Sequence, residues 1–152
     1  MNMNKKDICR YIEEYTKILR LPATRRYFAD EAQSAALTDA SYEDFLYNIL
    51  QKECDMRQEN ACKSRIRTAG FPQKKYFEDL LVDCLPQDAQ KKLKLLKSLD
   101  FIKNGQNVIL AGNPGTGKTH LATALGIKAC MEGYKVWFTT VPLLINHLKE
   151  TR

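Results

Sequence analysis

The sequence predicts an α/β fold, with a helical N-terminal domain followed by the start of a parallel-sheet α/β sandwich. Apolar residues recur at helical spacing through roughly the first 100 positions. After that, the pattern changes to two short β-branched runs, NVILA and KVWFTT, which are typical of strands buried on both faces. A glycine-rich turn and a helical stretch lie between the two runs. The order strand, turn, helix, strand, helix is that of an open α/β sheet.

The composition is that of a globular chain with a basic balance. Of the 152 residues, 44% are hydrophobic and 28% are charged, and the formal net charge is +6, which argues against a disordered chain. No apolar run approaches the roughly 20 residues that cross a bilayer, and no apolar segment follows the lysines of the start MNMNKKDICRY. Five scattered cysteines without a CxxC pair argue against a zinc site. We therefore expect a cytoplasmic protein with no membrane partner.

The helical N-terminal domain is expected over residues 1–72. Its first helix lies within Lys5–Leu21, where a single apolar stripe runs at helical spacing. Pro22 ends this helix and suits the first turn of a second one. Ser41 is expected to be the N-cap of a long third helix that stops near Gly70.

The long third helix is expected to be amphipathic. Its first turns should face a core through four apolar side chains: Phe45, Leu46, Ile49 and Leu50. Its polar side should carry two pairs at i,i+4 spacing: Glu53 with Arg57, and Glu59 with Lys63.

Residues 73–104 are expected to lead into the second domain. A connector up to Pro86 should be held to a neighbouring core by its apolar residues: Phe77, Leu80, Leu81 and Leu85. A helix from Gln87 to Lys103 should follow, with one face turned inward: Ala89, Leu93, Leu96 and Leu99.

Residues 105–152 contain a complete phosphate-binding loop motif, G-x-x-x-x-G-K-[ST], with an expected strand before it and a helix over Lys118–Met131 after it. The positions expected to bind a nucleotide are Gly112, Asn113, Pro114, Gly115, Thr116, Gly117, Lys118 and Thr119. The alternative is a glycine-rich turn with an incidental lysine. The complete motif between a strand and a helix argues against that alternative.

The residue types of the loop suit a polyphosphate. Glycines let consecutive N–H groups turn inward around it, and the N-terminus of the following helix adds partial positive charge. Lys118 would reach the β- and γ-phosphates, and the Thr119 hydroxyl would coordinate magnesium. ATP or ADP with Mg²⁺ is therefore the expected cofactor. A packing or surface position is favoured over a catalytic role for His120, and a core position is favoured over an adenine platform for Trp137.

A basic cluster ends the long third helix: Lys63, Arg65 and Arg67. The apolar stripe has faded there, so we expect these side chains to be free of the core and to contact the phosphates of double-stranded DNA without reading bases. Cations near a helix C-terminus also stabilise the helix itself. A solvated helix end is therefore an equal alternative.

The passage NVILAGNPGTGKTHLATALGIKACMEGYKVWFTTVPLLINHLKE resembles the P-loop region of the IstB-like ATPases. These are the AAA+ helpers of insertion-sequence transposases and are related to the DnaC-type helicase loaders. The resemblance is continuous from Asp100 to the end. The helix layout of the front half, with LRLPATRRYFADEA and IRTAGFP, is similar to the helical N-terminal domain of that family.

The resemblance implies the ATP-binding part of a protein that acts on DNA with a transposase and forms a homo-oligomer at full length. Family members continue with a Walker B acidic strand, a sensor residue and an arginine finger. No apolar strand ending in Asp-Glu follows Thr119, so we expect nucleotide binding rather than ATP hydrolysis. Two alternatives stay open: a DnaC-like adaptor of a replicative helicase, and a truncated, non-catalytic remnant that serves as an interaction domain.

Overall fold

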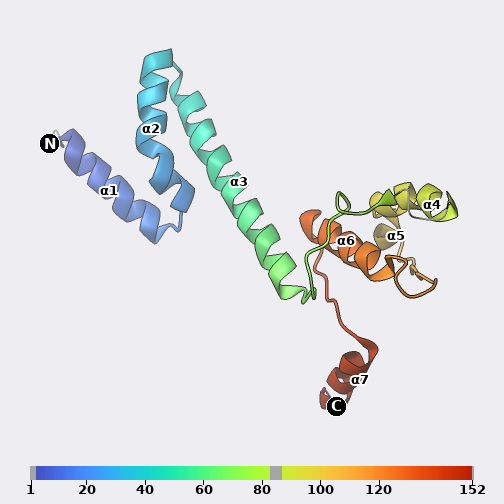
Figure 1. The fold of residues 1–152 in the computed structure, drawn as a ribbon. Helices are drawn as coiled ribbons and strands as arrows, with labels where there is room; N and C mark the ends of the chain where they lie inside the picture. The colour runs from blue at the N-terminus through green and yellow to red at the C-terminus, as the bar shows by residue number, and fades with distance from the viewer. Residues whose placement is uncertain (1–2, 83–86, 152) are drawn as a thin grey trace. The chain divides into compact units, whose positions relative to one another are not determined.

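The computed structural model describes residues 3–82 and 87–151, which form helices joined by turns and extended segments (Figure 1). The chain divides into two compact units, Met1–Ala61 and Cys62–Arg152. The expected domain boundaries after residues 72 and 104 stay predictions. No helix in the described ranges is long and apolar enough to span a bilayer.

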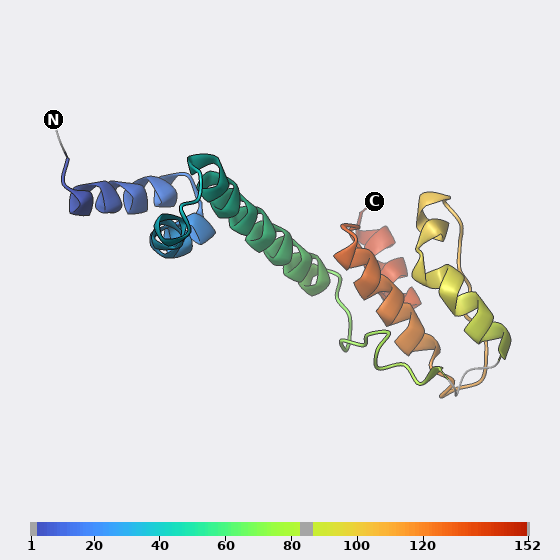
Figure 2. The ribbon, with the colours of Figure 1, turned by 90° about the horizontal axis from the view of Figure 1, so that it is seen from above.

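The first unit holds α1 (Lys5–Ile18), α2 (Pro22–Thr38) and most of α3 (Tyr42–Thr68). α1 and α2 pack against each other (Figures 1 and 2). α2 begins at Pro22, which confirms the role predicted for that residue. α1 ends before the expected Leu21, because Arg20 adopts a left-handed conformation with φ 54°.

Ser41 caps α3 as predicted. Its hydroxyl oxygen accepts a hydrogen bond from the backbone N–H of Asp44 at 3.0 Å, and the Ser41 backbone N–H donates back to the Asp44 carboxylate at 3.4 Å. The Ser41 hydroxyl also donates to that carboxylate at 2.7 Å. This reciprocal arrangement is a capping box with an aspartate in the third position.

Two of the four residues expected on the inward face of α3 lie there. Phe45 is half-buried and Ile49 is buried, whereas Leu46 and Leu50 are exposed. Each exposed leucine follows an inward residue and so lies about 100° further around the helix. Glu53 was expected on the polar side, and this was wrong. It is buried and accepts hydrogen bonds from the first turn of α2.

The second unit holds the end of α3, α4 (Gln87–Lys97), α5 (Asp100–Lys103), α6 (Lys118–Met131) and α7 (Val141–Glu150). α4 packs against α5 and α6. The centre of its core is formed by five buried residues: Leu93, Leu99, Leu121, Leu125 and Ala129. α6 is buried around most of its circumference, so it is the central element of this unit.

The single helix expected over Gln87–Lys103 is in fact two helices. Leu99 has a left-handed backbone, with φ 59°, and its side chain is only 2% exposed. The adjacent Ser98 hydroxyl oxygen lies 2.9 Å from the Leu95 carbonyl oxygen and 2.6 Å from the Asp100 carboxylate, so its single hydrogen can be donated to either acceptor and supports the break. Burial of Leu99 offsets the strain of a left-handed non-glycine residue. The predicted inward residues Leu93 and Leu99 are confirmed.

The connector packs against this core as expected, through Phe77 and Leu80. Leu81 was also expected to pack there, but its side chain is 73% exposed. Leu85 lies outside the described residues.

The two expected strand regions are extended segments, and the described residues contain no strand. Residues 134–138 alternate in burial. Tyr134, Val136 and Phe138 are half-buried, whereas Lys135 and Trp137 are exposed. In residues 107–111, Leu110 packs on the core and Ile109 is 89% exposed. The parallel sheet therefore stays a prediction, because a ladder requires paired strands and these two segments do not pair with each other.

Candidate functional site

The predicted phosphate-binding loop forms the turn between the extended residues 107–111 and α6. Helix α6 begins at Lys118, as the motif predicted. Gly115 and Gly117 both have φ 80°, a left-handed conformation that glycine adopts without steric cost. The spacing of the two glycines therefore suits the path of the backbone through this turn.

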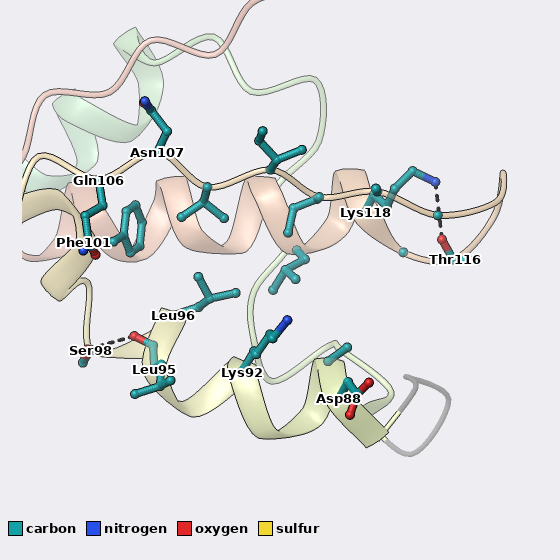
Figure 3. A pocket seen from close by; sticks show the side chains of 18 of the residues that line it. Asp88, Lys92, Leu95, Leu96, Ser98, Phe101, Gln106, Asn107, Thr116 and Lys118 are labelled. Atoms are coloured by element: carbon teal, nitrogen blue, oxygen red, sulfur yellow. Dashed lines mark hydrogen bonds between the residues drawn. The ribbon is translucent and has the colours of Figure 1, made fainter.

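The Lys118 amine lies over the loop (Figure 3). Its Nζ atom donates to the Asn113 carbonyl oxygen at 2.6 Å and approaches the Thr116 hydroxyl oxygen at 3.3 Å. The Thr116 hydroxyl donates to the same Asn113 carbonyl at 2.8 Å. These contacts hold the ammonium group beside the glycines of the loop.

Several donors of the loop are available for an anion. Among the described residues, the backbone N–H groups of Gly115, Gly117 and Lys118 donate to no protein acceptor. The Thr119 side chain is exposed in the first turn of α6, and its hydroxyl makes no hydrogen bond within that same part of the chain. Backbone donors, a helix N-terminus, an ammonium and a hydroxyl fit the chemistry of a phosphate chain with Mg²⁺.

The loop lines one end of a cavity of about 990 Å³. Its other walls come from α4, α5 and the extended residues 106–111. Figure 3 shows Lys92 and Leu96 of α4 pointing toward the segment that carries the loop. Sequence analysis did not identify these α4 residues as neighbours of the loop. No local motif carries that signal, because the fold brings together positions about 20 residues apart.

Of the two residues that sequence analysis left out of the site, His120 packs as expected, whereas the expectation that Trp137 lies in the core was wrong. His120 is half-buried, and its Nε2 atom lies 3.0 Å from the Tyr76 carbonyl oxygen. Because a carbonyl only accepts, this nitrogen must carry the proton. Trp137 is 56% exposed, and its ring lies edge-on to the His147 ring at 5.3 Å.

The basic cluster at the end of α3 is not uniform. Arg65 was expected to be free of the core, and this was wrong. Its Nε atom donates to the Cys130 carbonyl oxygen at 2.8 Å, at the C-terminus of α6. That carbonyl belongs to the last turn of α6, which carries partial negative charge, and it also accepts from the Gly133 N–H at 3.2 Å. Lys63 and Arg67 are exposed, and Arg67 makes no hydrogen bond or ion pair among the described residues.

Comparison with known proteins points to one family. A model described as IstB-like ATP binding protein matches residues 15–152. The chain is 31% identical over 138 residues to the ATP-binding protein of insertion sequence IS5376 from Geobacillus stearothermophilus, covering 91% of this chain and 55% of the relative. It is 37% identical over 120 residues to the ATP-binding protein of insertion sequence IS21 from Pseudomonas aeruginosa, covering 79% of this chain and 45% of the relative. The chain thus spans about half the length of the curated relatives it matches.

Proposed function

The chain belongs to the family of IstB-like ATP binding proteins, and from this premise we propose that it binds Mg-ATP through residues 112–119. The observation that carries the proposal is the position of the Lys118 amine, 2.6 Å from the Asn113 carbonyl, beside unpaired backbone donors of the loop. A phosphate group offers this ammonium a charged acceptor in place of a neutral carbonyl. The Thr119 hydroxyl would hold Mg²⁺, which would supply positive charge to neutralise the phosphates.

The proposal is tested by comparing ligands that differ in their phosphates. Calorimetric titration with ATP, ADP, AMP and adenosine in the presence of Mg²⁺ should give strong binding for the first two alone, because the loop recognises the phosphate chain. Equal affinity for adenosine and ATP would contradict a phosphate-binding loop. Tripolyphosphate should compete with ATP for the same reason.

We also propose that residues 107–111 and 135–140 are strands of a P-loop α/β sheet. The alternating burial over Tyr134–Phe138 supports this, since side chains of a strand point alternately to its two faces. The exposed Ile109 supports it as well, because a β-branched residue of that kind suits a face covered by a neighbouring element. Extended Cα chemical shifts and cross-strand NOEs are expected for both segments. Random-coil shifts there would contradict the sheet.

For partners, we propose duplex DNA and a transposase. The support for a transposase is that similar proteins are named as ATP-binding proteins of insertion sequences. For DNA, the support is the exposed cations Lys63 and Arg67, which could contact phosphates without reading bases. A pull-down with an insertion-sequence transposase as bait tests the first partner. Capture of a replicative helicase instead would favour the adaptor alternative.

A further inference from the structure

The segment that follows α3 runs beside α6 (Figure 2). Together with the last turn of α3, this segment forms what we call the strap, residues 65–76. It contacts α6 at both ends. Near the C-terminus of α6, Arg65 Nε donates to the Cys130 carbonyl oxygen at 2.8 Å. Near the N-terminus of α6, the His120 Nε2 atom lies 3.0 Å from the Tyr76 carbonyl oxygen. His120 directly follows Thr119, so one end of the strap lies next to the phosphate-binding loop.

The middle of the strap fits closely against α6 at Gly126. A Cβ atom added to Gly126 would come within 2.7 and 2.8 Å of two carbons of the Phe71 ring. Helix interiors disfavour glycine by about 1 kcal/mol relative to alanine. The strap explains a glycine here, because any side chain would displace the Phe71 ring.

The strap is also attached to residues 134–140. The Phe138 N–H donates to the Ala69 carbonyl at 2.8 Å, and the Phe71 and Phe138 rings lie 5.6 Å apart. Ala69 is fully buried. The strap therefore has contacts on both sides and cannot leave α6 without breaking them.

We propose that the strap positions α6 for nucleotide binding, with Arg65, Gly126 and His120 as positioning residues. The inference rests on the proposed function. Phosphate binding needs the N–H groups of the first turn of α6 to be correctly oriented. Contacts at residues 120, 126 and 130 fix the direction of the helix axis over most of its length. Because coupling is reciprocal, a nucleotide bound at the loop stabilises the last turn of α3 through the same contacts.

The experiment measures Mg-ATP affinity and amide hydrogen exchange on the same samples. Arg65→Ala should weaken ATP binding by about fivefold or more, and Arg65→Lys should restore part of the loss, because its ammonium is also a donor. Arg25→Ala is the matched control. Arg25 is an exposed arginine of α2, outside the strap, so the ATP affinity of this variant should stay within about twofold of the wild type. In the wild type, ATP should slow exchange at residues 62–68, and Arg65→Ala should remove this effect.

Gly126→Ala is a second test that does not depend on whether Arg65→Ala folds. Helix propensity alone predicts an unchanged or higher melting temperature for this variant. If the strap positions α6, Gly126→Ala should bind ATP more weakly than the wild type and show faster amide hydrogen exchange at residues 69–76. If the wild type binds ATP but neither variant changes the ATP affinity, or if ATP does not slow exchange at residues 62–68, the positioning role of the strap is overturned while the proposed function stands. Absence of ATP binding in the wild type would overturn both the strap and the proposed function.

Discussion

The buried carboxylate of Glu53 on α3 accepts a hydrogen bond from the backbone N–H of Ala23 in the first turn of α2, at 2.9 Å. The same oxygen accepts from the Thr24 N–H at 3.1 Å, and the other oxygen accepts from Arg57 Nε at 3.2 Å. α2 has no side-chain cap of its own, since Leu21 occupies the N-cap position. A residue about 30 positions later in the chain therefore supplies the cap, and its negative charge faces the positive end of the helix.

Glu53→Ala should destabilise the first unit by about 1 to 3 kcal/mol, because it leaves the N–H groups of Ala23 and Thr24 without their acceptor. Urea denaturation followed by circular dichroism measures this loss. Glu14→Ala is the matched control. Within the described residues, the Glu14 side chain makes only an exposed ion pair with Arg10 at 3.9 Å, and its replacement should have almost no effect. Equal stability of the two variants would show that Glu53 is not the cap of α2.

Cysteine reactivity should differ strongly between two positions. Burial raises the pKa of the Cys130 thiol above its ordinary value, the nearby Cys62 raises it further, and Arg65 opposes the shift. Less thiolate is therefore present at pH 8, and Cys130 is also inaccessible, whereas Cys54 is exposed. Mass spectrometry after brief iodoacetamide treatment should find Cys54 modified at least about tenfold faster. Equal rates in the native protein would contradict the burial of Cys130, and equal rates are expected only in urea.

The proposed DNA contact predicts a salt effect. Arg67→Ala should weaken binding to unrelated duplexes to a similar degree and reduce the slope of log K against log salt by about one. The comparison variant is Lys149→Ala, which removes an exposed cation from α7 and should change neither quantity. Fluorescence anisotropy at several salt concentrations measures both. If Arg67→Ala binds DNA with the wild-type slope, the end of α3 is a solvated helix terminus.

Thr119→Val should remove most of the magnesium dependence of ATP binding, because valine keeps the shape of threonine without the hydroxyl ligand. The ratio of the affinities with Mg²⁺ and with EDTA measures this dependence. Thr116→Val is the matched control, since its hydroxyl bonds within the loop to Asn113 and should leave the ratio unchanged. A wild-type ratio in Thr119→Val would exclude the hydroxyl as a ligand.

Local signals in the sequence predicted the N-termini of three helices. Pro22 begins α2, Ser41 caps α3, and α6 begins at Lys118. Each of these depends on residues within a few positions of one another. The phosphate-binding motif is equally local, because it requires a fixed order of glycines, lysine and threonine around one turn.

Long-range contacts could not be predicted in this way. The sequence around Arg65 indicates a surface cation, because the Cys130 carbonyl that it contacts is 65 positions away in the chain. The spacing of Glu53 and Arg57 indicates an exposed ion pair and does not show that the first turn of α2 packs against Glu53. The break at Leu99 is similar, since burial of its side chain stabilises a backbone conformation that leucine disfavours. Spacing along one helix does not reveal which neighbour covers it.

The most direct test of nucleotide binding is calorimetric titration of the Lys118→Ala variant with Mg-ATP. The Lys135→Ala variant, titrated in the same way, is the control. Lys118 holds its amine over the loop, 2.6 Å from the Asn113 carbonyl, whereas Lys135 is an exposed cation outside the loop. Loss of a charge-assisted contact to phosphate should weaken binding by about 10- to 100-fold in Lys118→Ala. Lys135→Ala should bind as the wild type does. Equal ATP affinity in Lys118→Ala and the wild type would contradict the assignment of residues 112–119 as the nucleotide site.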